Sequence, residues 1–376
     1  MVTSPKSPKS PQNPKSPQSP EGEAAAAPAP ATVPLSAEAQ SAAGILPASH
    51  WAAQPLPEED PGNDSASTIG SLTSTTASLS SSIYEYRTIH GRTYHGEMGS
   101  AESWTPNDER HVEAMDILHH TLLVQTDGKL YLAPLEKKKI KKVLDIATGS
   151  GLWSIDFADE FPNAIVIGTD VSPMQPSWVP PNVQFELDDC NQEWTWGENT
   201  FDFVNLRFLT GIVNDWYHLF RNAYRVCKPG GWVESSGTSS QFLSRDGTVK
   251  EGSAMDQWSK VFREGGYKLG RTFAVYEEDL QRKGMEAAGF VDIQYKDIEI
   301  PMGVWHPDEK AAERGLWWKL AVESDIDGYI NYMWNAVLGW TPEEAKVFTR
   351  HVKKEWNDPN IHAYFWMRVA WGRKPE

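Results

Sequence analysis

The sequence has few of the residues and segments that mark secreted, membrane-spanning or metal-binding proteins. Its 376 residues include two cysteines, Cys190 and Cys227, which are too few for a disulfide framework or a cysteine-rich zinc site. No apolar stretch approaches the roughly 18 uninterrupted residues of a membrane span, and the N-terminus lacks the apolar core of a signal peptide. These absences predict an intracellular protein with no transmembrane segment and no metal site, resident in the nucleus, the cytoplasm or both.

Basic residues are outnumbered by acidic ones. Lysine and arginine together number 35 against 51 acidic residues, so the formal net charge is −16. An acidic chain of this kind is not expected to bind nucleic acid directly. The one basic run, at residues 137–142, is interpreted as a solvated lead-in to a strand. The alternative for this run is a nuclear-import or partner-binding patch.

Residues 1–82 lack the apolar and aromatic side chains that a core needs. They consist of Ser-Pro repeats with lysines, an Ala/Pro tract and a Ser/Thr-rich tract, and Trp51 is the one aromatic residue before Tyr84. Such a segment cannot bury enough apolar surface to offset its chain entropy. We therefore predict a disordered leader over 1–82 and a folded domain over 83–376.

The most informative stretch is residues 142–170, which read KVLDIATGSGLWSIDFADEFPNAIVIGTD. An apolar run, a glycine turn, a helix-like stretch and a second apolar run predict one βαβ unit of a parallel sheet. Gly149 and Gly151 let the backbone approach a ligand, and the helix start behind them offers free N–H groups. Asp170 closes the second strand about 20 residues after the turn, where an acidic side chain suits the hydroxyl groups of a ribose.

Three residues of this unit bear on the type of cofactor. Ser154 stands where a pyrophosphate-binding turn has glycine or alanine, and Trp153 crowds the start of the helix. Asp145, within the first strand, suits a ligand with positive charge, such as the sulfonium and amino groups of S-adenosylmethionine. The residues therefore favour a methyl donor over a nicotinamide cofactor. The alternative is a glycine turn that binds no cofactor.

Strands and helices continue to alternate after this unit. Further strands are predicted at 183–187, 201–205, 232–234, 290–295 and 363–371. Helices are predicted at 216–226 and 277–288. The pattern is that of an α/β, Rossmann-like fold, with a seven-stranded, mostly parallel sheet and helices on both faces. Helical stretches within 244–275 and 305–357 are expected to form a lid above the ligand crevice.

Acidic residues also follow the third predicted strand. Asp188, Asp189 and Cys190 lie at its carboxyl end, which faces the ligand crevice in an open α/β sheet. A carboxylate there can accept from an adenine amino group, and the next backbone N–H can donate to the ring. The alternative role for these acids is to cap a helix or turn.

Ahead of the first strand, residues 107–109 resemble a helix start, with an N-cap and early acids. His119 and His120 lie on this helix and are interpreted as partly buried helix residues rather than metal ligands. Residues 130–132 are expected to form a short strand.

Taken in order, the motifs resemble the class I S-adenosylmethionine-dependent methyltransferases. The matching segments are VLDIATGSG, IGTD, LDDC, FDFVNLR and VCKPGGWVE. Ala147 takes the place of the family's first glycine, a small-for-small exchange that should leave the loop open. The resemblance implies S-adenosylmethionine as the cofactor.

A narrower resemblance, over residues 83–376, is to the LaeA-like methyltransferases of filamentous fungi. It rests on HGRTYHG, PNDERHVEAMDILHH, GKLYLAP, DVSPMQPSWVPPN, DWYHLFRNAYR and IHAYFWMRVAWGRKP. It implies a regulator of development, sporulation, transcription and secondary metabolism, with velvet-domain regulators or related methyltransferases as partners. The domain would comprise a helical cap at 83–141, a cofactor-binding core at 142–235, and the remaining strands with the lid at 236–376.

The resemblance also implies a set of cofactor-binding residues at the matching positions. To the methionine part it assigns Asp145, Ala147, Gly149 and Gly151. To the ribose it assigns Asp170, and to the adenine Asp188, Asp189 and Cys190. Bordering the transferring methyl it places Asn205 and Arg207, with Tyr94 closing the cofactor from above.

Methyl transfer from a sulfonium is an in-line displacement with a neutral leaving group, so alignment and exclusion of water matter most. A hydroxyl or amine acceptor also needs a base. His90, His95 and His119 are available for this, and the sequence singles out none of them as catalytic. Three hypotheses follow: an enzyme that methylates a protein or itself, an enzyme with a small natural product as acceptor, and a non-catalytic scaffold in a regulatory complex.

Overall fold

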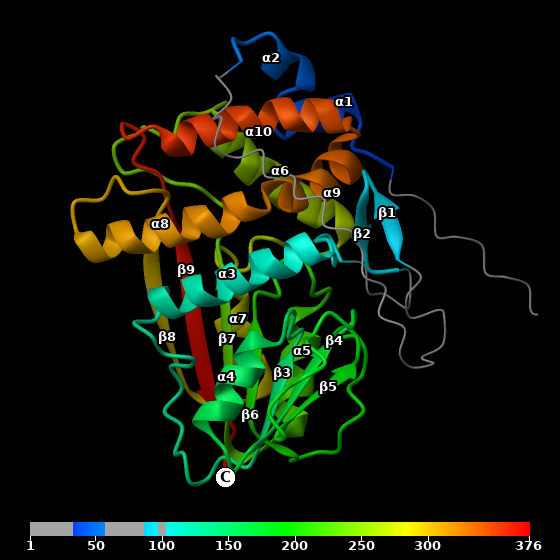
Figure 1. Cartoon of the computed structure of the whole chain (residues 1–376), viewed down its shortest axis with the longest axis vertical. Helices are drawn as coiled ribbons and strands as arrows, with labels where there is room; N and C mark the ends of the chain where they lie inside the picture. Colours follow the sequence, from blue (N-terminus) through cyan, green and yellow to red (C-terminus); the bar gives the residue numbers. More distant parts are fainter. Residues whose placement is uncertain (1–32, 57–85, 97–102) are drawn as a thin grey trace, which may run out of the picture. The chain divides into compact units, whose positions relative to one another are not determined.

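Seven strands form one sheet in the order β5-β4-β3-β6-β7-β9-β8 (Figure 1). The computed structural model of the chain describes residues 33–56, 86–96 and 103–376. The strands of the sheet are β3 (Lys142–Ile146), β4 (Ile165–Asp170), β5 (Val183–Leu187), β6 (Phe201–Arg207), β7 (Cys227–Thr238), β8 (Val291–Pro301) and β9 (Tyr364–Arg373). Only β9 runs antiparallel to its neighbours β7 and β8 within this sheet. The predicted seven-stranded, mostly parallel sheet is confirmed.

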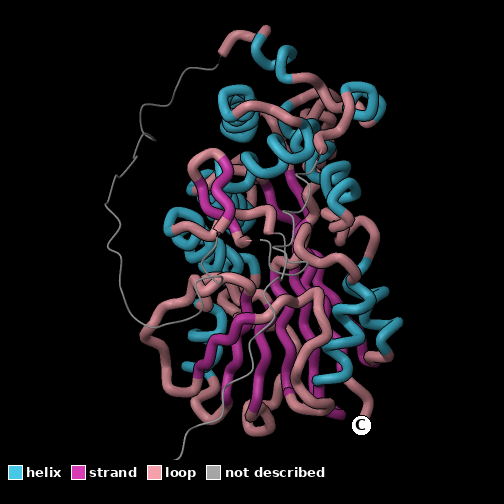
Figure 2. Tube along the Cα trace, turned by 90° about the vertical axis from the view of Figure 1, so that its right-hand side faces the viewer, coloured by secondary structure: helices cyan, strands magenta, loops and turns pink. Residues whose placement is uncertain are grey.

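Helices cover both faces of the sheet (Figure 2). α4 (Leu152–Glu160) packs on one face, in a core that includes Val143. α5 (Trp216–Val226) and α7 (Leu280–Ala288) pack on the other face, in a core that includes Leu144. Successive side chains of a strand point to opposite faces, so the continuous apolar run of β3 supplies both cores.

A helical layer lies beyond the carboxyl ends of the parallel strands (Figures 1 and 2). Its long helices are α3 (Glu109–Gln125), α6 (Ala254–Leu269), α8 (Glu309–Ser324), α9 (Ile326–Leu338) and α10 (Pro342–Asn357). They share a core that is rich in tryptophan and phenylalanine. α6 follows β7, and α8 to α10 are inserted between β8 and β9, where the sequence predicted a lid. None of the helices in the described ranges is both long enough and apolar enough to cross a membrane.

Part of the predicted leader is folded against the helical layer. It forms α1 (Ala37–Ala42) and α2 (Ala48–Ala52). Trp51 of α2 is 2% exposed, and its ring packs edge-on against that of Phe348 in α10, with centroids 5.2 Å apart. His351 of α10 lies on the same indole.

The prediction of disorder over 1–82 is therefore wrong for residues 33–56. A single tryptophan can bury a large apolar area, and the average composition of an 82-residue segment conceals it. Residues 1–32 and 57–82 lie outside the described residues.

Two local features ahead of the sheet also differ from expectation. β1 (Arg87–Ile89) and β2 (Arg92–Tyr94) form a hairpin that the sequence analysis did not predict. Residues 130–132 form no strand, because the N–H groups of Leu132 and the next residue donate to Oε2 of Glu234 rather than to a neighbouring strand. The segment thereby ties the end of α3 to β7.

Candidate active site

A cavity of about 300 Å³ lies between the carboxyl ends of the parallel strands and the helical layer. One end is lined by the turns that follow β3, β4 and β5, and the other by side chains of α3, α6, α8 and α9. This is the place where open α/β sheets bind their ligands.

The carboxylate of Asp145, 1% exposed, is held by three side chains at the polar end of the cavity. Its Oδ2 accepts from the hydroxyls of Thr148 at 2.6 Å and Ser154 at 2.9 Å. Its Oδ1 accepts from Nδ2 of Asn205 at 2.8 Å. Asn205 is buried behind Asp145 and does not line the cavity, so it orients this carboxylate and does not border a ligand. Ser154, which weakened the dinucleotide interpretation, is needed here as a donor.

The turn after β3 has three residues in the left-handed region of backbone space. The φ angles are 51° at Ala147, 60° at Gly149 and 83° at Gly151. A Cβ on Gly151 would lie 2.9 Å from Cε1 of Phe185 and closer still to Cζ, so both packing and backbone conformation require glycine there. Ala147 and Gly149 line the cavity, whereas Gly151 supports the turn from behind.

Asp170 closes β4 at the cavity wall, as the sequence predicted. Its carboxylate accepts from the N–H groups of Gly149 at 2.9 Å and Ser172 at 3.0 Å. Burial raises the pKa of Asp170 to about 6, although these N–H donors act in the opposite direction. A carboxylate offers about four acceptor sites, so Asp170 can also accept from a ligand hydroxyl.

Asp188, Asp189 and Cys190 line the cavity beyond β5. The alternative role considered for these acids, capping of a turn, is also observed. Oδ1 of Asp188 accepts from the N–H of Asp189 at 2.9 Å, and Oδ1 of Asp189 accepts from the N–H of Asn191 at 3.0 Å. Burial raises the pKa of Asp188 and that of the Cys190 thiol.

Arg207 ends β6 and lines the cavity beside His119 of α3. Its Nη1 lies 3.3 Å from Nδ1 of His119, and Nε2 of the same imidazole lies 2.9 Å from Oδ2 of Asp156. The guanidinium carbon is 5.8 Å from the ring centroid of Trp153. That indole is fully buried and donates to the carbonyl of Leu130 at 2.8 Å, so it belongs to the core and leaves the cavity open.

Aromatic side chains from the helical layer and its adjoining segments line the other end of the cavity. They are Trp104, Phe208, Phe242, Trp258, Phe262, Phe273, Trp318, Tyr329 and Phe365. All lining carboxylates lie at the polar end and come from β3, β4 and the turn after β5. The aromatic end is therefore suited to an apolar or aromatic group and to the exclusion of water.

Some sequence candidates lie away from the cavity wall. Tyr94 does not line the cavity and therefore does not close it from above, because its ring packs against Tyr332 within the helical layer, 5.9 Å away. The Tyr94 hydroxyl has no hydrogen-bond partner among the described residues. His90 is exposed in the turn between β1 and β2, and His95 is buried without lining the cavity. Of the three candidate bases, His119 alone reaches the cavity wall.

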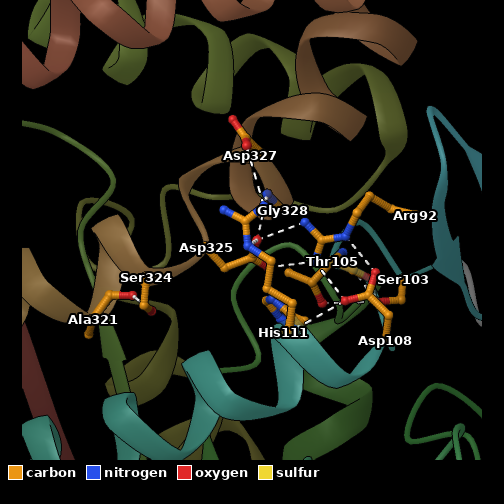
Figure 3. Close-up of polar contacts among 11 residues, drawn as sticks. Arg92, Ser103, Thr105, Asp108, His111, Ala321, Ser324, Asp325, Asp327 and Gly328 are labelled. Carbon is orange, nitrogen blue, oxygen red and sulfur yellow. Dashed lines mark hydrogen bonds and ion pairs between the residues drawn. The ribbon is translucent and has the colours of Figure 1, made fainter. Parts of the chain in front are cut away.

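A buried ion network that the sequence analysis missed joins α3 to α9 (Figure 3). Both oxygens of Asp325, the N-cap of α9, accept from the guanidinium of Arg92, at 2.7 and 2.8 Å, and Nδ1 of His111 lies 2.8 Å from Oδ2. Burial alone would raise the pKa of Asp325, yet the hydrogen bonds from His111 and Arg92 hold it at about 2. Arg92 also pairs with Asp108, the N-cap of α3. His111 lines the cavity, so the network supports its wall.

Two buried polar atoms at the cavity have no hydrogen-bond partner within the described part of the chain. They are Oδ1 of Asn107 and Oγ1 of Thr210. Nδ2 of Asn107 donates to Oγ of Ser172 at 3.2 Å, which orients the amide. Buried polar groups are rarely left unpaired, so a water, a ligand or another part of the chain is expected to supply the partner of each atom. The described residues include no group of three or more His, Cys, Asp or Glu side chains that could hold a metal ion.

The chain is similar to several fungal proteins and to a known domain family. Residues 117–295 match a family model described as a methyltransferase domain. The methyltransferase pytC of Aspergillus terreus is 35% identical over 303 residues, which are 80% of this chain and 92% of that protein. The secondary metabolism regulator laeA of Aspergillus fumigatus is 30% identical over 326 residues, 85% of this chain and 86% of that protein. A protein-methionine methyltransferase laeA of Emericella nidulans is 29% identical over 294 residues, 77% of each chain.

Proposed function

Because the chain belongs to the LaeA-like S-adenosylmethionine-dependent methyltransferases of filamentous fungi, we propose that it methylates a protein acceptor in the control of secondary metabolism. The observation that supports this proposal is that one cavity joins the acidic strand ends to an aromatic compartment under the helices.

The residues at the polar end fit S-adenosylmethionine, which supplies an electrophilic methyl group on a sulfonium when bound. Asp145 places negative charge near a cationic ligand, and Asp170 accepts from the ribose hydroxyls. Asp189 and the N–H of Cys190 recognise the adenine, with Asp188 beside them. The unpaired oxygens of two cavity residues add further positions for polar recognition.

Catalysis in this cavity consists mainly of positioning. The aromatic side chains hold the acceptor group in line with the transferring methyl and exclude water from the path. Of the three candidate bases, His119 is the one at the wall, and its Nδ1 faces Arg207 while its Nε2 faces Asp156. With both ring nitrogens engaged, His119 is not free to remove a proton, so an acceptor that needs no base suits this site.

The acceptor and setting are part of the same proposal. Two relatives carry names that include secondary metabolism regulation and protein-methionine methylation, which supports a protein acceptor and a regulatory role. We propose that velvet-domain regulators or related methyltransferases are its partners, that it acts in the nucleus, the cytoplasm or both, and that it affects transcription, development and sporulation.

A small natural product is the second candidate acceptor. The compartment at the far end of the cavity is lined by aromatic rings, which would also stack on a planar aromatic substrate.

The proposal is tested by methyl transfer from labelled S-adenosylmethionine into lysate of a strain that lacks the gene, separated into protein and small-molecule fractions. The full chain is compared with Asp145→Ala, which removes the carboxylate at the polar end. The matched control is Asp159→Ala, which removes an exposed carboxylate of α4.

We expect label in the protein fraction with the wild type and the control, and none with Asp145→Ala. Label confined to small molecules would replace the protein acceptor with the second candidate. Absence of label, together with full restoration of the cellular phenotype by Asp145→Ala, would leave only a scaffold role.

A further inference from the structure

Arg207 is a cation at the wall of the cavity without an anionic partner in contact. Its neighbours within the described ranges are Nδ1 of His119 at 3.3 Å and the indole of Trp153 at 5.8 Å, and no described carboxylate lies within ion-pair distance of its guanidinium. Burial lowers the pKa of Arg207, although Asp145, Asp156 and Glu234 act on it from a distance in the opposite direction. Arg207 is half-buried at the cavity wall, and a cation that is partly removed from water without a paired anion favours an anionic ligand.

The side chains around Arg207 do not form an ion pair with it. Nε2 of His119 donates to the carboxylate of Asp156, which leaves a lone pair on Nδ1 to accept from Arg207. The imidazole therefore orients the guanidinium without neutralising it, and no other hydrogen bond engages Arg207 in the described part of the chain. The carboxylate of Asp145, on the neighbouring strand β3, is already held by Thr148 and two further donors.

The position of Arg207 along the sheet identifies the anion. Asp189 follows β5, Asp170 ends β4 and Arg207 ends β6, with β3 between the last two. If the adenine lies at Asp189 and the ribose at Asp170, the amino-acid end of S-adenosylmethionine reaches β3 and β6. Neighbouring strands are about 4.8 Å apart, so three spacings give roughly 14 Å, the span of an extended adenosyl amino acid. In the register of β3 and β6, Leu206 pairs with Ile146, which sets Arg207 beside Ala147 of the glycine turn.

We infer that Arg207 binds the α-carboxylate of S-adenosylmethionine and that His119, held by Asp156, is its positioning residue. This inference rests on the proposed function, since it takes the methyl donor as the ligand of the polar end. The guanidinium would face a planar carboxylate with two N–H donors, a geometry that arginine provides and lysine does not. An oxyanion of the acceptor is the other source of the same chemistry.

The test compares two ligands that differ only in this carboxylate, S-adenosylmethionine and its decarboxylated analogue. Their affinities for the full chain are measured by calorimetry for the wild type, for Arg207→Met and for Arg207→Lys. The matched control is Arg271→Met, because Arg271 also lines the cavity but is bonded through Nε to Asn214 at 2.9 Å and lies near Cys190, at the adenine end.

We expect the wild type to prefer the carboxylated ligand by at least tenfold. Arg207→Met should lose this preference by binding S-adenosylmethionine at least tenfold more weakly while its affinity for the analogue changes less than threefold. Arg271→Met should keep the preference even if it lowers the affinity for both ligands. His119→Leu should reduce the preference without abolishing it.

The inference is overturned if Arg207→Met keeps the wild-type preference. It is also overturned if both affinities are unchanged while methyl transfer is lost, which would assign Arg207 to an acceptor oxyanion and leave the proposed function standing. If Arg207→Met does not fold, the inference is tested with Arg207→Lys, which retains the charge. A smaller preference for S-adenosylmethionine than in the wild type supports the inference, and an equal preference overturns it. Failure of the wild type to bind either ligand would instead contradict the proposed function itself.

Discussion

Acidification should weaken cofactor binding through Asp170. The carboxylate is buried at the end of β4, and burial raises its pKa to about 6. Its oxygens already accept from two backbone N–H groups, at 2.9 and 3.0 Å. A proton on this carboxyl removes its charge and one of its acceptor sites, so its hydrogen bonds to the backbone N–H groups and to the ribose hydroxyls weaken. The ionised form is therefore the one that binds.

The magnitude follows from the pKa. When only the ionised form binds, the dissociation constant rises by a factor of one plus the ratio of protonated to ionised carboxyl. Between pH 7 and pH 5 this gives about a tenfold loss of affinity, or about 1.4 kcal/mol. At pH 6, binding should release about half a proton, because half of the free protein must lose one.

Calorimetry with S-adenosylmethionine at pH 5, 6 and 7, in buffers of different ionisation enthalpy, measures both quantities. Asp170→Asn provides the comparison, since it should bind more weakly at pH 7 and lack this component of the pH dependence. An affinity that stays constant from pH 7 to pH 5, or an equal slope in Asp170→Asn, would refute the assignment of this carboxylate to the ribose.

Three further predictions concern stability and are read from denaturant unfolding. At pH 7, Glu234→Gln should change the unfolding free energy by less than about 1 kcal/mol, whereas Glu234→Ala should cost about 3–5 kcal/mol, because it leaves the backbone N–H groups of Leu132 and Ala133 without their acceptor. Burial raises the folded-state pKa of Glu234 to about 7 from 4.5, so the wild type should gain stability over Glu234→Gln as the pH falls from 7 towards 4.5; a gain on raising the pH would contradict this. Gly151→Ala should lower the unfolding free energy by about 2–4 kcal/mol, because of its positive φ and the overlap of the new Cβ with Phe185. The control Gly247→Ala, with a φ of 72° and nothing near its Cβ, should lower it by about 1 kcal/mol. Equal losses would exclude a contribution from the overlap. Trp51→Ala should cost about 3–5 kcal/mol and Trp51→Phe clearly less, since the ring packing is kept; no loss with Trp51→Ala would show that the folded part of the leader adds no stability.

Local sequence signals predicted the structure correctly where a single segment determines it. The run from Lys142 to Asp170 contains a strand, a turn and a helix whose pattern needs no distant partner, and the structure places Asp145, Gly149 and Asp170 there as expected. The helix start at Asp108 follows from the same kind of local rule, since its side chain caps the first turn of α3.

Other features depend on residues far apart in the chain, and no local pattern predicts them. Trp51 is buried because α10 passes over it, about 300 residues later in the sequence. Asn205 turns away from the cavity because Asp145 of the neighbouring strand accepts from it. Arg92 and Asp325 are 233 residues apart, yet they share a buried ion pair.

The sequence by itself determined the order of strands and helices, the glycine turn and the acidic strand ends, because periodicity, backbone preference and charge act over a few residues. Only the tertiary structure decided which side chains face the cavity, which stand behind them, and how the aromatic compartment closes. Those outcomes depend on packing between segments brought together by the fold, and the identity of a residue does not specify its distant neighbours.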